Sequence, residues 1–193
     1  MILKREAAKI INEELTVDDS LFLYHDVCTN GIGYVDLMFK TDSIAPEQIP
    51  YLGLLKSVLG YVDTENYTYG ELFNEINANT GGINCGVEVF DRADSTEEFQ
   101  AMFSVRGKAL YTKLDFLFKM IGEILNSSKL EDTKRLYEIV ASVKSRAQVN
   151  LTGAGHSTAV LRAAAYSSPM AAFQDEMAGI GYYQFIEKLE KRF

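Results

Sequence analysis

The chain has 193 residues, of which 47% are hydrophobic and 24% charged, and its net charge at pH 7 is −8. This length and balance predict one globular domain that needs neither a disulfide framework nor a metal to hold it together. The acidic balance argues against sequence-independent nucleic-acid binding, which neutralises phosphates with Lys and Arg, and no apolar run approaches the ~20 residues that span a membrane.

Cysteine usage and the N-terminus bear on the compartment. Cys28 and Cys85 are the two cysteines, too few for a disulfide framework, so we expect a reducing, cytoplasmic environment. The N-terminal segment mixes charged with apolar residues and lacks the hydrophobic stretch of a signal peptide.

The first 18 residues are expected to form an arm or linker helix. Apolar residues recur at helical spacing between Ile2 and Leu15, and the polar run Thr16–Asp19 ends the pattern. Residues 19–193 would then form a single α+β domain, with strands and two helices up to about residue 108 and helices from about 109.

Two strands are predicted next, at Leu21–Val27 and Ile32–Phe39. The turn Thr29-Asn30-Gly31 separates them, and an Asn-Gly pair supplies the positive φ angles that tight hairpin turns require. We therefore expect these strands to pair as a hairpin.

Two helices follow the predicted hairpin. Pro46 suits the first turn of a helix that runs to about Leu59, because the missing N–H is not needed there. Thr68 and Glu71 have the spacing of a capping box, which predicts the start of a second helix. Gly81-Gly82 would end it.

A second strand pair is predicted at Ile83–Phe90 and Glu98–Arg106, joined by the polar turn Asp91–Glu97. The later strand alternates between apolar and polar residues, as half-buried antiparallel strands do. Its apolar positions are Phe99, Ala101, Phe103 and Val105.

From Ala109 the sequence predicts helices almost throughout. A long helix is expected from Glu131 to Asn150, Ser168-Pro169 has the pattern of an N-cap followed by an N1 proline, and the last helix begins at Gly181. The whole pattern predicts an α+β fold with an antiparallel sheet of about four strands covered on one face by helices.

Candidate metal ligands are scarce. The chain has two histidines, His25 and His156, and neither lies in an H-E-x-x-H or H-x-x-E-H motif, which would bring both imidazoles to one helix face. His25, Asp26 and Cys28 are close in sequence, but residues i and i+3 of a strand point to opposite faces. We expect a polar cluster at a hairpin edge here instead of a metal site.

Nucleophilic catalysis has one weak candidate. Cys85 lies in the apolar alternation of Ile83–Phe90 and is expected in the core. Cys28 beside the predicted turn could be exposed, and a thiolate paired with His156 would make the chain a small thiol hydrolase.

The glycine motifs have structural explanations. Gly153-Ala154-Gly155 lies between predicted helices with no preceding strand, so it does not predict a phosphate-binding loop. Residue by residue, the sequence thus assigns no catalytic, cofactor-binding or metal-binding residue.

Three stretches together resemble a known family. They are Thr29–Phe39, a region from Tyr69 to Ile83 that ends in Thr-Gly-Gly-Ile, and a region from Arg162 to Phe185 that contains Tyr-Ser-Ser-Pro and Gly-Tyr-Tyr-Gln-Phe. In this order and spacing they resemble the third, peptidase-associated domain of presequence-protease-like enzymes, a subfamily of the pitrilysin/insulinase zinc metallopeptidases. The resemblance covers about residues 20 to 190.

The resemblance implies a non-catalytic role. Such enzymes have four homologous domains of the processing-peptidase-like (LuxS/MPP-like) α/β-roll, which close around an unfolded peptide, and an H-x-x-E-H motif in the first domain holds zinc. This chain would contribute part of the chamber wall, with no cofactor of its own and with the other domains and peptide substrates as partners. The family's fold has further strands after the helical stretch, so the chain is expected to hold part of the repeat unit.

A stand-alone interaction or assembly module is the alternative. Exposed apolar surface on the helices around Ala163–Ala172 and Gly179–Phe185 would serve either role, because both need a docking face. An open reading frame with H-x-x-E-H upstream would favour the peptidase domain.

Overall fold

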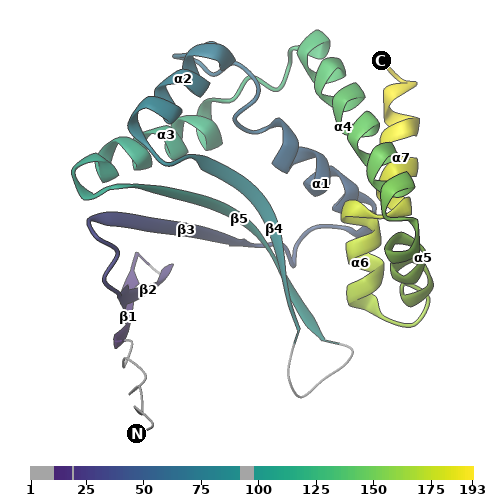
Figure 1. The fold of residues 1–193 in the computed structure, drawn as a ribbon, viewed down its shortest axis with the longest axis horizontal. Coiled ribbons are helices and arrows are strands. Elements are labelled where there is room, and N and C mark those ends of the chain that lie inside the picture. Colours follow the sequence, from purple (N-terminus) through teal and green to yellow (C-terminus); the bar gives the residue numbers. More distant parts are fainter. Residues whose placement is uncertain (1–10, 19, 92–97) are drawn as a thin grey trace, which may run out of the picture.

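The computed structural model describes residues 11–18, 20–91 and 98–193, and these residues form helices packed on a small antiparallel sheet (Figure 1). The strands are β1 Ile11–Val17, β2 Ser20–Asp26, β3 Ile32–Lys40, β4 Ile83–Asp91 and β5 Phe99–Leu110. The helices are α1 Ile49–Val58, α2 Tyr69–Asn79, α3 Leu114–Ser127, α4 Thr133–Gly153, α5 Gly155–Ala164, α6 Pro169–Ala178 and α7 Ile180–Glu190, with short 3₁₀ turns η1 Pro46–Gln48 and η2 Tyr111–Lys113. The predicted α+β class is confirmed.

The strands form two antiparallel sheets instead of the expected single sheet of about four. β1 pairs with β2, and a separate three-stranded sheet has the order β3-β5-β4. The expected pairing of Leu21–Val27 with Ile32–Phe39 is therefore wrong, since β3 pairs with β5. Asn30 and Gly31 do have positive φ, at 52° and 85°, but their turn links the two sheets.

The expected N-terminal helix is wrong from Ile11 onward. Ile11–Val17 is a strand, and it forms a hairpin with Ser20–Asp26 in which Val17 faces Ser20. Cross-strand pairing here outweighs the helical spacing of a few apolar residues. The rest of that predicted helix lies outside the described residues, and the division into an arm (1–18) and a domain (19–193) stays a prediction.

Helix starts follow the predicted signals. The Thr68 hydroxyl accepts a hydrogen bond from the Glu71 amide at 3.3 Å, and the Thr68 amide donates to the Glu71 carboxylate at 2.9 Å. Ser168 accepts from the Ala171 amide at 3.3 Å, with Pro169 at the first position of α6. These side chains satisfy amides that a helix leaves without a partner.

Helices α1–α3 lie on one face of the three-stranded sheet, and α4–α7 form a second group at its end (Figure 1). The predicted inward residues Ala101, Phe103 and Val105 of β5 are buried against the first group. Gly107 allows close contact with α3, because a Cβ there would lie 2.7 Å from a methyl carbon of Leu117. A smaller cluster around Val140 and Ile186 joins α4 to α7.

The helical half begins slightly later than expected. β5 continues to Leu110, so the helices start with η2 at Tyr111 instead of at Ala109. The predicted long helix is observed as Thr133–Gly153.

Candidate functional site: the uncovered face of the sheet

One face of the three-stranded sheet is not covered by the described helices (Figure 1). The strand register brings alternate residues of β3, β4 and β5 to this face, with Asp36 opposite Arg106 and Tyr34 opposite Lys108. Because side chains alternate along a strand, these residues point away from the buried Phe103 and Val105. The sheet thus presents one functional surface to its surroundings.

Arg106 links all three strands at the centre of this face. Its Nε donates to Asp36 Oδ2 on β3 at 2.7 Å, and its Nη1 lies 3.1 Å from Glu88 Oε1 on β4. The hydrogen bond to Asp36 raises the pKa of Arg106 further. The Arg106 side chain is still half exposed, so the guanidinium remains accessible to a ligand that approaches the sheet.

Apolar and aromatic side chains surround this ion cluster. Tyr34, Met38 and Phe90 are all exposed on the same face, Tyr34 at 65%. Ser104, which the alternation places toward solvent, is nevertheless buried at 1% exposure, because it lies in the central strand between its partners Met38 and Gly86. The surface offers contacts for aromatic, apolar and charged groups without a deep pocket.

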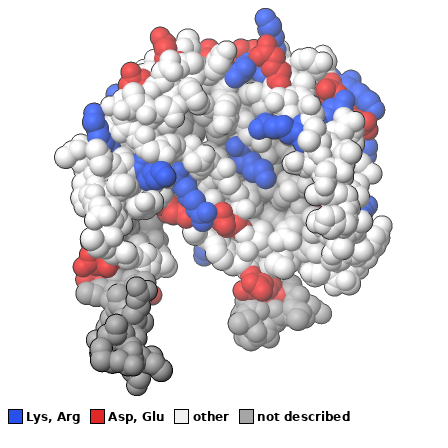
Figure 2. Space-filling model, in the orientation of Figure 1, with Lys and Arg blue, Asp and Glu red and all other residues white. Residues whose placement is uncertain are grey.

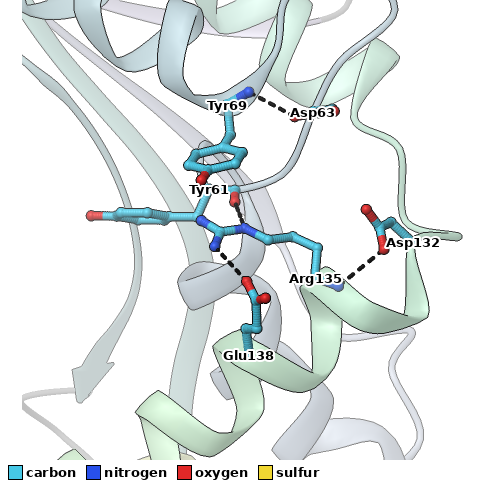
Figure 3. A network of polar contacts seen from close by, with 6 residues as sticks. All are labelled: Tyr61, Asp63, Tyr69, Asp132, Arg135 and Glu138. Atoms are coloured by element: carbon cyan, nitrogen blue, oxygen red, sulfur yellow. Dashed lines mark hydrogen bonds and ion pairs between the residues drawn. The ribbon is translucent and has the colours of Figure 1, made fainter.

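A second polar cluster surrounds Arg135 on α4 (Figure 3). The guanidinium lies over the Tyr69 ring, 3.9 Å from its centroid, and Nε donates to the Tyr61 carbonyl at 2.9 Å. Nη1 donates to Glu138 at 3.0 Å. Together these contacts join α4, the start of α2 and the chain between α1 and α2, beside a small cavity of about 270 Å³. No sequence motif predicts this cluster, because its members are far apart in the chain.

A larger groove of about 720 Å³ lies between η1, α1, the start of β5 and helices α5–α7. Phe99, Phe173 and Phe185 line it, and Arg162 and Lys188 are also among its lining residues. Sequence reasoning missed this groove as well, since its walls come from separate elements.

The histidines do not form a site. His25 lies on β2 with its Nδ1 2.6 Å from Asn12 Oδ1 on β1, and His156 lies near the start of α5. Figure 1 places β2 and α5 on opposite sides of the molecule. Among residues 11–18, 20–91 and 98–193, no three His, Cys, Asp or Glu side chains are grouped as metal ligands would be. These residues therefore do not offer a zinc site.

The cysteines occupy different environments. Cys28 is exposed in the loop before β3, where its Sγ donates to Asn30 Oδ1 at 3.8 Å. Cys85 is half-buried on β4 and packs against the core, and burial raises the pKa of its thiol to about 11. This confirms the expectation that Cys85 is a core residue.

The glycines have structural roles in the described chain. Gly82 has a φ of 104° directly after α2, and the Gly81 amide donates to the Lys108 carbonyl at 2.7 Å. Gly153 and Gly155 lie at the junction of α4 and α5. Charged side chains of both signs are interspersed on the face shown in Figure 2, in agreement with the lack of a basic motif in the sequence.

The fold and sequence define the class of protein. The model of the peptidase-associated family of metallopeptidase family 16, subfamily C, matches residues 3–189. The chain belongs to this family, which confirms its resemblance to the peptidase-associated domain of presequence-protease-like members of the pitrilysin/insulinase group.

Relatives with printed names agree with the family. The chain is 36% identical over 187 residues to "Protein HypA" of Clostridium perfringens, which covers 97% of this chain and 19% of that protein. It is 29% identical to the mitochondrial presequence protease of Yarrowia lipolytica over 83% of this chain, and 28% identical to presequence protease 1 of Arabidopsis thaliana over 88%, in each case covering 16% of the relative. The chain thus spans less than a fifth of the length of these relatives.

No helix within the described parts of the chain combines the length and apolar character needed to cross a membrane.

Proposed function

We propose that the chain is a non-catalytic domain of a large zinc-dependent metallopeptidase that degrades unfolded oligopeptides, and that it forms part of the wall of the closed peptide chamber. Its partners are the other domains of the same polypeptide and the peptide substrate, with no nucleic acid or membrane involved. Zinc is held in the parent's first domain, and the parent acts in the cytoplasm.

The uncovered sheet face carries this proposal. A chamber wall must contact peptides of many sequences, so broad and weak contacts serve it better than a deep, specific pocket. Arg106 with its two carboxylate partners, and the exposed Tyr34 and Phe90, offer charge-assisted hydrogen bonds and stacking across three strands.

The scattered reactive groups support a non-catalytic role. Hydrolysis by a thiolate or a metal needs a nucleophile and a base within hydrogen-bond reach, or several converging ligands. His25 and His156 lie on opposite sides of the molecule, and the Cys85 thiol is protonated at neutral pH. A reaction would therefore need residues from elsewhere in the polypeptide.

Activity measurements on two proteins test the proposal. The isolated 193-residue chain is expected to cleave no unfolded peptide and to bind no stoichiometric zinc, whereas the complete polypeptide does both. Zinc-dependent turnover by the isolated chain would contradict the non-catalytic role.

The wall role needs a separate test in the complete polypeptide. Arg106→Gln is expected to raise KM for a long peptide by several-fold with little change in kcat, because it removes binding contacts distant from the reacting bond. Lys191→Gln removes the same charge near the end of α7, where the Lys191 side chain is 68% exposed, and serves as the matched control. Equal KM values for both variants would exclude the sheet face as a substrate contact.

A further inference from the structure

The β1–β2 hairpin is isolated from the three-stranded sheet. Within the described residues, each of its strands pairs only with the other, while β3, β4 and β5 form their own sheet. All of its side chains that the structure describes are exposed, including Leu21 at 68% and Leu23 at 52%. Two-stranded hairpins are marginally stable in water, and a third strand or a packing helix is needed to support them.

The sequence of β2 fits a strand in the interior of a sheet. Leu21 and Leu23 point to one face, and Phe22 and Tyr24 point to the other. A strand at a solvent-exposed edge usually carries Lys, Pro or a bulge that blocks further pairing, and Ser20–Asp26 contains neither Lys nor Pro. Both the backbone edge and the faces of this hairpin are therefore suited to contact with other elements.

A second open edge lies close along the chain. β3 is an outer strand of the three-stranded sheet, because β5 lies between β3 and β4. Residues 27–31 connect β2 to β3, and the Tyr111 amide fixes this loop to the sheet by donating to the Gly31 carbonyl at 2.9 Å. The Thr29 and Tyr111 hydroxyls are also 2.9 Å apart.

The connection is long enough for one strand to fit between the two edges. Neighbouring strands are about 4.8 Å apart, so a strand inserted between β2 and β3 separates them by roughly 10 Å. A five-residue connection can span up to about 17 Å. β1 and β2, by contrast, are joined by residues 18 and 19 and pair directly.

We propose that an extended segment of the same polypeptide, outside residues 1–193, inserts as a β-strand between β2 and β3 and joins the hairpin and the three-stranded sheet into one continuous sheet. This inference rests on the proposed placement of the chain in a larger peptidase. The relatives supply ample chain for such a segment, since the match covers 19% of the Clostridium protein and 16% of the two presequence proteases. Coverage of both apolar faces of the hairpin also favours a folded part of the same molecule over a single short peptide.

Hydrogen exchange of backbone amides, followed by mass spectrometry, tests the inserted strand. In the isolated chain, segments 20–26 and 32–40 are expected to exchange rapidly at the amides that β1 and β5 leave unpaired. In the complete polypeptide these amides become protected by about 100-fold or more, because a new ladder and burial shield them. Helix α4 should show similar protection in both proteins and serves as the internal control.

A proline variant gives an independent readout. Leu23→Pro removes an amide and fixes the backbone of β2. It is expected to leave the unfolding midpoint of the isolated chain unchanged, because the hairpin supports no other described element there, and to lower Tm of the complete polypeptide. An unchanged Tm in both proteins would overturn the inference.

The possible outcomes separate this inference from the proposed function. Rapid exchange of segment 20–26 in a complete polypeptide that still cleaves peptides would reject the inserted strand alone. Protection that rises with concentration in the isolated chain, together with a dimer in light scattering, would assign the edge to a second copy and contradict the inference. Peptide cleavage by the isolated chain would reject the proposed function and leave the exchange result standing.

Discussion

Arg162 on α5 donates a hydrogen bond through Nη1 to the buried carboxylate of Asp175 on α6, at 2.7 Å. The Asp175 side chain is 1% exposed and also accepts from the Ile180 amide at 3.0 Å and the Gly181 amide at 3.1 Å. One carboxylate thus caps the start of α7 and ties α5 to α6. This pairing explains two members of the stretch from Arg162 to Phe185 that carries the family resemblance.

Asp175→Ala is expected to lower the free energy of unfolding by roughly 3–5 kcal/mol, because it removes the buried partner of Arg162 and leaves two amides without their acceptor. Urea unfolding monitored by circular dichroism measures the change. Glu187→Ala breaks an exposed pair with Lys191 at 3.7 Å and should change the value by no more than about 0.5 kcal/mol. Equal effects of the two substitutions would show that Asp175 is not an anchor.

Gly179 and Gly181 are required by the same carboxylate. A Cβ at Gly179 would lie 2.9 Å from the Asp175 Cα, and one at Gly181 would lie 2.8 Å from Asp175 Oδ2. Gly179→Ala should therefore destabilise the fold by about 1–3 kcal/mol through overpacking. Gly122→Ala in α3 is the matched control, since its Cβ would meet its nearest neighbour only at 4.0 Å, and it should stabilise by about 0.5–1 kcal/mol. Thermal unfolding of both variants checks the opposite signs.

Much of the fold could be predicted because its signals are local. Thr68 with Glu71, Ser168 with Pro169, and the alternation around Phe103 each report on a few neighbouring residues. Capping and burial of alternate residues act over one turn or one strand, so short sequence patterns contain them.

The errors concern long-range pairing. An Asn-Gly turn between two apolar runs predicts a hairpin, but the turn at Asn30 connects two sheets, and the strand before it pairs backward with Ile11–Val17. Which strand edges meet depends on elements distant in sequence. The Arg106 cluster and the Arg135 cluster were missed for the same reason, since Asp36 and Arg106 are 70 residues apart. The family resemblance contributed what the residue chemistry could not, namely the class of protein.

Glu123 should make stability depend on pH in the acid range. Its carboxylate accepts from the Asn66 amide at 3.2 Å and from the Asn66 side chain at 2.9 Å. Hydrogen bonds from Thr64 and Asn66 lower the pKa of Glu123. A lowered pKa in the folded state contributes stability above the unfolded-state pKa of about 4.3, and this contribution is lost as pH falls through the folded pKa.

The stability difference between the wild type and Glu123→Gln is therefore expected to be constant above about pH 5 and to shrink at lower pH. Urea unfolding at several pH values between about 3 and 7 measures it. Asn66→Ala removes both donors and should reduce the acid dependence in the same direction. A difference that does not vary with pH would show that these hydrogen bonds do not favour the ionised form.

The two thiols should react at very different rates with iodoacetamide at about pH 8. Cys28 is exposed, whereas Cys85 is half-buried and has a pKa of about 11. Only about one Cys85 in a thousand is then a thiolate at this pH, and the thiolate is the reactive form. Mass spectrometry should find Cys28 modified first and Cys85 protected until urea is added. The Cys28→Ser chain should remain unlabelled in its native state, and labelling of Cys85 there at the rate seen for Cys28 would mean that β4 opens readily from the sheet. Because Cys28 has no described histidine partner, Cys28→Ser should also leave the peptidase activity of the complete polypeptide unchanged, and a loss of that activity would revive the thiol-hydrolase alternative.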